Sequence, residues 1–167
     1  MDRNPKSLAA VIALVVGTGL VAFGATAQTV QDIEGTWKLV SATVTQDGKT
    51  RDIFGSHPNG TMTFEASGRF AQVIIAADLP KFASKSREAG TAEENKAVVQ
   101  GSIAYFGTFT VGAGGIVNLH VESSTFPNMT GTDQKRSIKI SGDEMTWGNA
   151  TPAVGSGIAE QLWKRAR

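Results

Sequence analysis

Short runs of alternating apolar and polar residues, separated by glycine-containing turns, fill most of this chain after its first 30 residues. Alternation with a period of two is the pattern of a β-strand with one buried face. Such runs cover residues 36–45, 50–54, 60–65, 69–76, 104–111, 116–123, 134–140, 144–148 and 158–165. Sequential antiparallel strands joined by short turns predict a closed up-and-down barrel or a sandwich. We therefore expect an all-β fold of about eight strands.

Several turns predict how neighbouring strands pair. Asp47-Gly48 is a strong hairpin signal. The turn at residues 66–68 would place Phe64 opposite Phe70, and Glu65 would then face Arg69.

The turn at residues 142–143 would place Ile138 opposite Trp147. Because both residues are apolar, this face of the hairpin points to the core. Arg136 has the same parity as Ile138, so we expect the arginine to point inward as well.

Residues 78–100 break the strand pattern. Residues 92–100 are rich in helix formers and predict one short helix or lid. A plain surface connection and a functional gate both remain open for this segment.

Residues 1–27 stand apart from the rest of the chain. Arg3 and Lys6 precede an uncharged run at residues 8–23, and Ala25 and Ala27 then form an A-x-A site. These are the three parts of a secretory signal peptide. The uncharged run is shorter than the roughly 20 residues that span a bilayer. We expect cleavage after Ala27, a near-neutral mature domain at residues 28–167 in the periplasm or outside the cell, and no stable membrane insertion after cleavage.

Composition narrows the function classes further. The net charge of +1 gives no electrostatic reason to expect a nucleic-acid partner. The absence of cysteine excludes disulfides, thiolate metal sites and thiol nucleophiles. The two histidines lack the spacing of a zinc site, and no nucleotide-binding loop or G-x-S-x-G elbow occurs. We expect no redox or metal cofactor; the oligomeric state stays open.

Gly35-Thr36-Trp37 opens the first strand, and this G-x-W start resembles the first strand of lipocalins. With the runs GTWKLVSATVTQDGKT, HPNGTMTFEASGRFA, AYFGTFTV and NLHVESSTFPNMTGTDQKR, the chain resembles the bacterial lipocalin-like domain family over roughly residues 33–147. The resemblance implies a lipocalin or calycin-type barrel. It also implies structural roles for Gly35 and Trp37, with Arg165 or Lys164 covering the tryptophan at the closed end.

His120 is a candidate base, and its role depends on the strand register. If Val121 pairs near Arg136, the valine and its alternate neighbours form an apolar face, His120 points outside and Glu122 lies beside Lys135. A shift by one residue reverses every side chain. Arg136 would then face Glu122, with His120 inside beside them. The family resemblance favours a functional histidine in this strand.

An inward Arg136 must find a partner, because a buried unpaired charge is costly. It would hold a ligand carboxylate through two parallel hydrogen bonds, or pair with Glu122 or Glu144, or reach the rim of the barrel. Tyr105, the only tyrosine, offers a ring and a hydroxyl to a ligand.

Three functions are compatible with these residues. The leading hypothesis is an exported barrel that binds a small, mainly hydrophobic ligand, with Arg136 and Tyr105 as polar anchors. Its candidate walls are Met62, Phe64, Phe106 and Trp147. The second is an isomerase, cyclase or hydratase-like enzyme in which His120 or Glu122 moves protons and Arg136 stabilises negative charge. The third is a filled structural barrel that acts through its surface.

Overall fold

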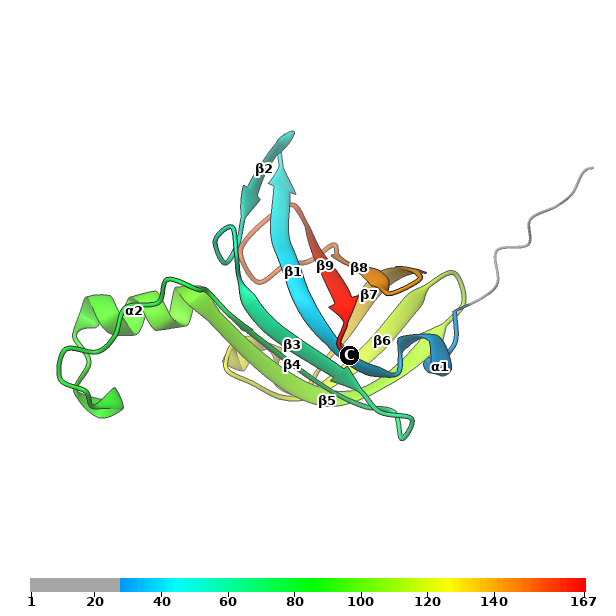
Figure 1. The fold of residues 1–167 in the computed structure, drawn as a ribbon, viewed down its shortest axis with the longest axis horizontal. Helices are drawn as coiled ribbons and strands as arrows, with labels where there is room; N and C mark the ends of the chain where they lie inside the picture. Colours follow the sequence, from blue (N-terminus) through cyan, green and yellow to red (C-terminus); the bar gives the residue numbers. More distant parts are fainter. Residues whose placement is uncertain (1–27) are drawn as a thin grey trace, which may run out of the picture.

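A computed structural model describes residues 28–167 of the protein (Figure 1). These residues form nine strands: β1 (Gly35–Gln46), β2 (Lys49–Asp52), β3 (Asn59–Phe64), β4 (Arg69–Ile75), β5 (Ser102–Gly112), β6 (Ile116–Ser124), β7 (Thr132–Ser141), β8 (Glu144–Asn149) and β9 (Ile158–Arg165). The helices are α1 (Val30–Ile33) and α2 (Ala92–Gly101), with 3-10 turns η1 (Arg87–Ala89) and η2 (Pro127–Met129). The predicted all-β class is confirmed. The signal-peptide prediction for residues 1–27 lies outside the described residues.

Eight of the nine described strands close into an up-and-down barrel, as the sequence predicts. The sheet order runs from β2 through β1 and then β3 to β9, and all neighbours are antiparallel. β1 also pairs with β9, from Trp37 opposite Arg165 to Thr45 opposite Ile158. This pairing closes the barrel, and closure removes the free edges of the eight barrel strands.

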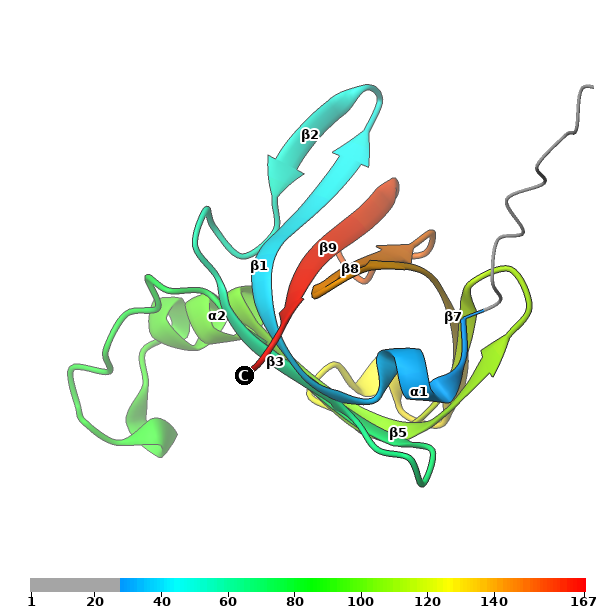
Figure 2. The same ribbon diagram turned by 45° about the vertical axis from the view of Figure 1, so that its right-hand side comes forward.

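The extra strand, β2, forms a hairpin with the far end of β1 and extends beyond the barrel (Figure 2). Asp47 and Gly48 have φ of 50° and 72°, as a type I′ turn requires. The sequence predicts a returning strand over residues 50–54, whereas β2 ends at Asp52. Ile53 and Phe54 leave the strand, and both line the cavity described below.

The short and the long connections between strands lie at opposite ends of the barrel. Short turns at residues 65–68, 113–115 and 142–143 join consecutive strands at one end. The long connections at residues 76–101, 125–131 and 150–157 all lie at the other end, because antiparallel strands alternate in direction. The barrel therefore has a closed end with tight turns and an open end bordered by long loops.

Trp37 and Arg165 seal the closed end. Trp37 is completely buried, and its indole Nε1 donates to the backbone oxygen of Ile33 in α1 at 2.8 Å. The guanidinium carbon of Arg165 lies 4.3 Å from the centre of the indole ring, a cation–π arrangement. Arg165 also donates to the backbone oxygens of Asp32 and Glu34. Arg165 rather than Lys164 therefore covers Trp37, the residue expected to have a structural role.

Aromatic side chains fill the closed half of the barrel. Phe64 pairs with Phe70, as predicted, and their ring centres lie 6.3 Å apart in a stacked arrangement. The ring of Phe109 meets that of Phe64 edge-on, with the ring centres 4.9 Å apart. Trp147 lies 5.6 Å from Phe64 and pairs with Ile138, which confirms that predicted register too. These residues are at most 7% exposed, so the closed half forms a packed core.

The predicted helix is confirmed as α2. Thr91 and Glu94 form a capping box at its N-terminus, which satisfies backbone N–H groups that lack partners in the first turn. The connection that contains α2, residues 76–101, projects away from the barrel (Figure 1), and none of its described residues lines the cavity. Within residues 28–167, no helix is long and apolar enough to cross a membrane.

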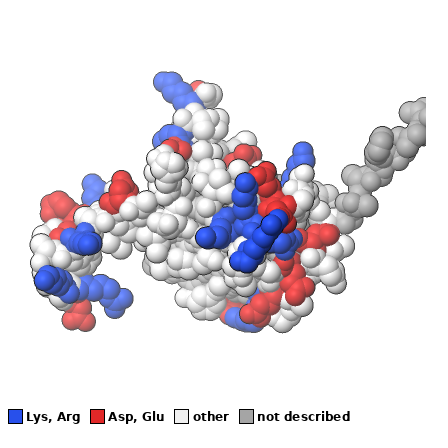
Figure 3. All heavy atoms as spheres, viewed as in Figure 1, with Lys and Arg blue, Asp and Glu red and all other residues white. Residues whose placement is uncertain are grey.

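Charged side chains of both signs lie close together on the outer surface shown in Figure 3. Lys164 and Glu144 form an ion pair at 3.3 Å, and Arg167 and Asp143 form another at 2.7 Å. Both pairs join the β7–β8 turn to the C-terminal end of β9. Exposed pairs of this kind contribute little to stability, and the mixture of signs gives no single-sign patch on this face.

Candidate functional site

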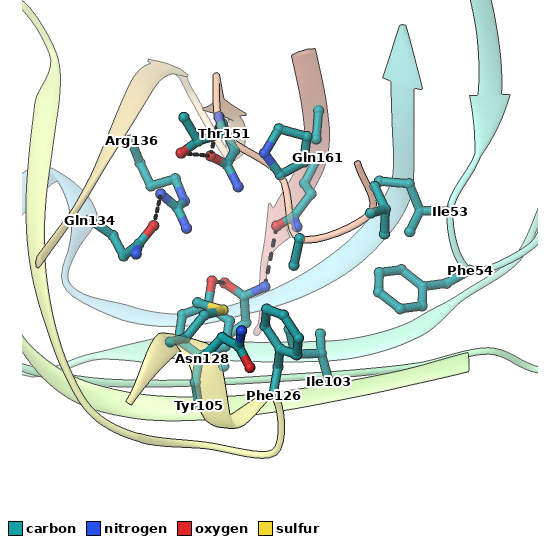
Figure 4. Close-up of a pocket in the computed structure, with 17 residues that line it drawn as sticks. Ile53, Phe54, Ile103, Tyr105, Phe126, Asn128, Gln134, Arg136, Thr151 and Gln161 are labelled. Atoms are coloured by element: carbon teal, nitrogen blue, oxygen red, sulfur yellow. Dashed lines mark hydrogen bonds between the residues drawn. The ribbon is translucent and has the colours of Figure 1, made fainter. Parts of the chain in front are cut away.

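The open half of the barrel holds a cavity of about 340 Å³. Its lining residues come from the strands inside the barrel and from three open-end loops (Figure 4). They are Ile53, Phe54, Gln72, Ile103, Tyr105, Phe126, Asn128, Met129, Gln134, Arg136, Asn149, Thr151, Pro152, Ala153, Val154, Ala159 and Gln161. The volume lies at the small end of the range for ligand pockets.

The cavity has an apolar mouth and a polar floor. The loops after β2, between β6 and β7, and between β8 and β9 supply most of the apolar side chains. These are Ile53, Phe54, Phe126, Met129, Pro152, Ala153 and Val154. The strands supply most of the polar ones from positions that point into the barrel, and these are Gln72, Tyr105, Gln134, Arg136, Asn149 and Gln161; the loops add Asn128 and Thr151. A molecule that fits both zones is apolar along its body and polar at the end that enters first.

Among the described residues, Arg136 is the only charged one that lines the cavity. Its side chain points inward because it shares a face of β7 with Ile138, and it is only 3% exposed. Nη1 donates to the backbone oxygen of Lys135 at 2.8 Å and, weakly, to Oε1 of Gln134 at 3.4 Å. Among residues 28–167 it forms no ion pair with a carboxylate. The cavity therefore holds a positive charge that the described chain does not neutralise.

A hydrogen-bonded relay crosses the floor beside Arg136. Trp163 Nε1 donates to Oε1 of Gln161 at 3.1 Å, and Nε2 of Gln72 donates to the same oxygen at 3.4 Å. The Tyr105 hydroxyl then donates to Oε1 of Gln72 at 2.7 Å. Burial raises the pKa of Tyr105, and the nearby Arg136 guanidinium only partly opposes this shift. Tyr105 is therefore a neutral, protonated phenol at neutral pH.

The structure divides the predicted ligand-binding residues into three groups. Arg136 and Tyr105 line the cavity. Met62, Phe64 and Trp147 are at most 1% exposed and belong to the packed core instead. The sixth residue, Phe106, lies outside the barrel.

Phe106 points to solvent and is 45% exposed. Adjacent residues of a strand point to opposite faces, so Tyr105 and Phe106 cannot both enter the barrel. A register shift in the β5–β6 pairing follows between Phe106 and Gly107. The prediction that Phe106 forms a wall of the interior is therefore wrong.

His120 also lies on the outer face, with its side chain 53% exposed. Its Nδ1 lies 2.8 Å from Oδ1 of Asp133, its pairing partner on β7. The faces of the first predicted register are correct, since Val121 and its alternate neighbours are buried inside. The partners are wrong, because Val121 pairs with Thr132 instead of Arg136. The alternative register, with His120 inside, is not the one observed.

Glu122 is likewise an outer-face residue, and it does not pair with Lys135. It forms two hydrogen bonds to Arg69 of β4, at 2.9 and 3.1 Å. These bonds hold the pKa of Glu122 below its usual value. Glu65, the predicted partner of Arg69, makes only a backbone bond to it across the turn.

The sequence interpretation missed the glutamines of the floor. Gln72 lies between Phe70 and Ile74, and Gln161 lies between Ala159 and Trp163, each on an inward-facing parity. Both stand two residues from buried apolar neighbours. Parity alone would have identified them as polar residues inside the barrel.

A family model places this chain among known proteins. A search of curated proteins found no match. Among solved structures, the chain is similar to the crystal structure of a mutant of the fluorescent protein UnaG, with 12% identity and a TM-score of 0.38. The match covers 83% of this chain and 99% of that one. The family model described as a lipocalin-like domain matches residues 34–166, which include all nine described strands. The chain therefore belongs to the lipocalin-like domain family, as its G-x-W start and strand motifs predict.

Proposed function

We propose that this protein binds a small, mainly hydrophobic molecule in the open half of the barrel, with a polar group of that molecule against Arg136. The observation that carries the proposal is the guanidinium itself, which is 3% exposed inside a cavity and forms no ion pair with a described carboxylate. Burying such a charge is costly. A ligand acceptor that pairs with it would offset that cost.

The loops at the mouth support the hydrophobic part of the proposal. Phe126 and Val154 are 37% and 40% exposed, and both line the cavity. Partly exposed apolar side chains that converge on a concave site are typical of small-molecule pockets. Their position fits a ligand whose apolar body extends from the floor to the open end.

Binding fits the cavity better than catalysis does. General acid–base chemistry needs a proton acceptor within reach of the substrate, yet the lining residues found within 28–167 include no carboxylate, histidine or lysine. The raised pKa of Tyr105 keeps its phenol protonated. His120 and Glu122, the residues named for an enzyme, lie on the outer face of the barrel. The third hypothesis, a barrel filled by its own side chains, fits the closed half alone, because the open half contains the cavity of about 340 Å³.

Native mass spectrometry tests this proposal. The protein would be purified from its own host without detergent, alongside an Arg136→Ala variant and a Lys135→Ala control. Lys135 is the outward neighbour of Arg136 on β7. We expect an added mass that dissociates on activation in wild type and control and that is reduced in Arg136→Ala. A bare chain in all three preparations, with no binding in a screen of small apolar molecules, would contradict the proposal.

We also propose export to the periplasm or beyond, on the strength of the charged, apolar and A-x-A segments at residues 1–27. N-terminal sequencing of the protein from its host tests this. A chain that begins at Gln28 would support export. A chain that retains the first 27 residues in the cytoplasm would contradict it.

A further inference from the structure

The orientation of the Gln161 amide is fixed by a neighbour that can only donate. The indole Nε1 of Trp163 lies 3.1 Å from the amide, and an indole N–H has no acceptor capacity. The amide atom that faces it must therefore be the oxygen. Trp163 is completely buried, so this bond is protected from competition by water.

This single bond sets the donor and acceptor ends of the other hydrogen bonds in the relay. Because Gln161 presents an oxygen, Gln72 must turn its nitrogen toward it, at 3.4 Å. Gln72 then turns its own oxygen to Tyr105, whose hydroxyl proton is committed to it at 2.7 Å. Both amide oxygens of this hydrogen-bonded relay therefore accept a bond, and the phenol proton is not available to a ligand.

In the other two amides of the floor, Gln134 and Asn149, the side-chain oxygen also accepts a bond from the chain. Oε1 of Gln134 accepts from Arg136, and Oδ1 of Asn149 accepts from the backbone N–H of Thr151 at 3.0 Å. The amide nitrogens of Gln161 and Asn149 donate to no other described residue. With the guanidinium of Arg136, whose two hydrogen bonds both start from Nη1, these nitrogens give the floor an excess of free donors.

We propose that Gln161, held in one orientation by Trp163, acts with Arg136 to make the cavity select ligands whose inserted end is a carboxylate. An end that itself carries N–H protons would be rejected. This inference rests on the proposed function and deepens it. A carboxylate offers only acceptors, which the donors of the floor satisfy. An amide or an ammonium group would bring N–H protons to a floor whose amide oxygens already accept bonds from the described chain, and an unsatisfied buried donor is costly.

Three matched probes distinguish these ends: decanoate, decanamide and decylamine, which share one apolar chain. Binding of each to the full mature domain would be measured by calorimetry at pH 7, with a second series built on naphthalene. We expect decanoate to bind at least about tenfold more tightly than decanamide, and decylamine to bind more weakly still.

Two variants test the residues that set this preference. Gln161→Glu keeps an oxygen for Trp163 but replaces the free donor with a second oxygen, so decanoate affinity should fall about tenfold or more. Trp163→Phe removes the bond that locks the amide, so the preference for decanoate over decanamide should fall toward parity. Glu160→Gln is the control, because Glu160 precedes Gln161 but lies exposed on the outer face. Its thermal unfolding and selectivity should match wild type.

The outcomes separate the inference from the proposed function. A decanoate preference that Gln161→Glu abolishes and Glu160→Gln retains supports the inference. Equal or stronger binding of decanamide overturns it while leaving the binding function intact. If no carboxylate of either series binds, the inference is overturned as well, and the native mass spectrum then decides the proposed function independently. If Trp163→Phe fails to fold, Gln161→Glu alone carries the test.

Discussion

Replacing Arg136 with methionine should stabilise the ligand-free barrel while it weakens ligand binding. The effective penalty for burying one ion is several kcal/mol, and a hydrogen bond from a charged donor recovers about 1.5–3 kcal/mol. Arg136 makes one short bond of 2.8 Å to the Lys135 oxygen and one long contact of 3.4 Å to Gln134. These bonds do not fully repay the burial of a side chain that is 3% exposed.

Methionine removes that deficit and adds apolar surface. Burial of such a side chain contributes about 1.5–3 kcal/mol, against about 1–3 kcal/mol lost if the Lys135 oxygen keeps no partner. Arg136→Met should therefore raise the free energy of unfolding by about 0–2 kcal/mol, consistent with other buried ions replaced by apolar residues. For a domain of this size the melting temperature would rise by up to about 8 °C.

Urea unfolding of the ligand-free proteins measures this change, with the slope on denaturant concentration checked to be the same in both. Lys135→Met is the matched control, because Lys135 is exposed and adjacent on β7; its stability should stay within about 0.5 kcal/mol of wild type. A loss of more than about 2 kcal/mol in Arg136→Met would refute the reasoning. Arg136 would then be a structural residue whose hydrogen-bond partners compensate for the cost of burying its charge. The argument for a ligand acceptor would lose its basis.

Three further predictions concern the cavity floor, the closed end and the cavity mouth. Because burial raises the Tyr105 pKa above its unfolded value of 10.0, the stability it contributes is complete below pH 10 and is lost as the pH rises through the folded pKa. Tyr105 is the only tyrosine, so tyrosinate absorbance reports it directly, and Arg136→Met should raise its pKa further. Trp37→Phe removes a buried 2.8 Å hydrogen bond and should cost about 2–4 kcal/mol in thermal unfolding without changing ligand stoichiometry. Phe126→Ala should weaken ligand affinity measured by calorimetry, whereas Phe106→Ala should not; equal effects would contradict the assignment of the cavity mouth.

The closed half of the barrel could be predicted from sequence because its signals are local. The turn at residues 142–143 joins its strands directly, so apolar matching alone placed Ile138 opposite Trp147. The turn at residues 66–68 did the same for Phe64 and Phe70. Where a loop has only two or three residues, turn geometry leaves few registers to choose from.

The β6–β7 pairing could not be predicted in the same way, because the connection between these strands contains η2. A loop of that length does not fix an offset. The side chains of β6 were assigned to the correct faces, since parity needs only the alternation within one strand. The partner of Val121 was wrong by four residues, Thr132 instead of Arg136, an even shift that leaves parity intact.

The residues of β7 that break this apolar matching are residues that line the cavity. Matching apolar residues would set Leu119 opposite Ile138, whereas the structure sets it opposite Gln134 and sets Val117 opposite Arg136. Apolar strand residues thus pair with polar ones inside a barrel, which local stability does not favour.

The aromatic core of the closed half allows the open half to depart from this rule. Trp37, Phe64, Trp147 and Trp163 are each at most 1% exposed, and together they bury the large apolar surfaces on which barrel stability depends. A floor of amides and one guanidinium can then stay unmatched without unfolding the chain. Polar residues inside a closed barrel reduce stability unless something satisfies them, so their concentration around one cavity is explained best by a ligand that does.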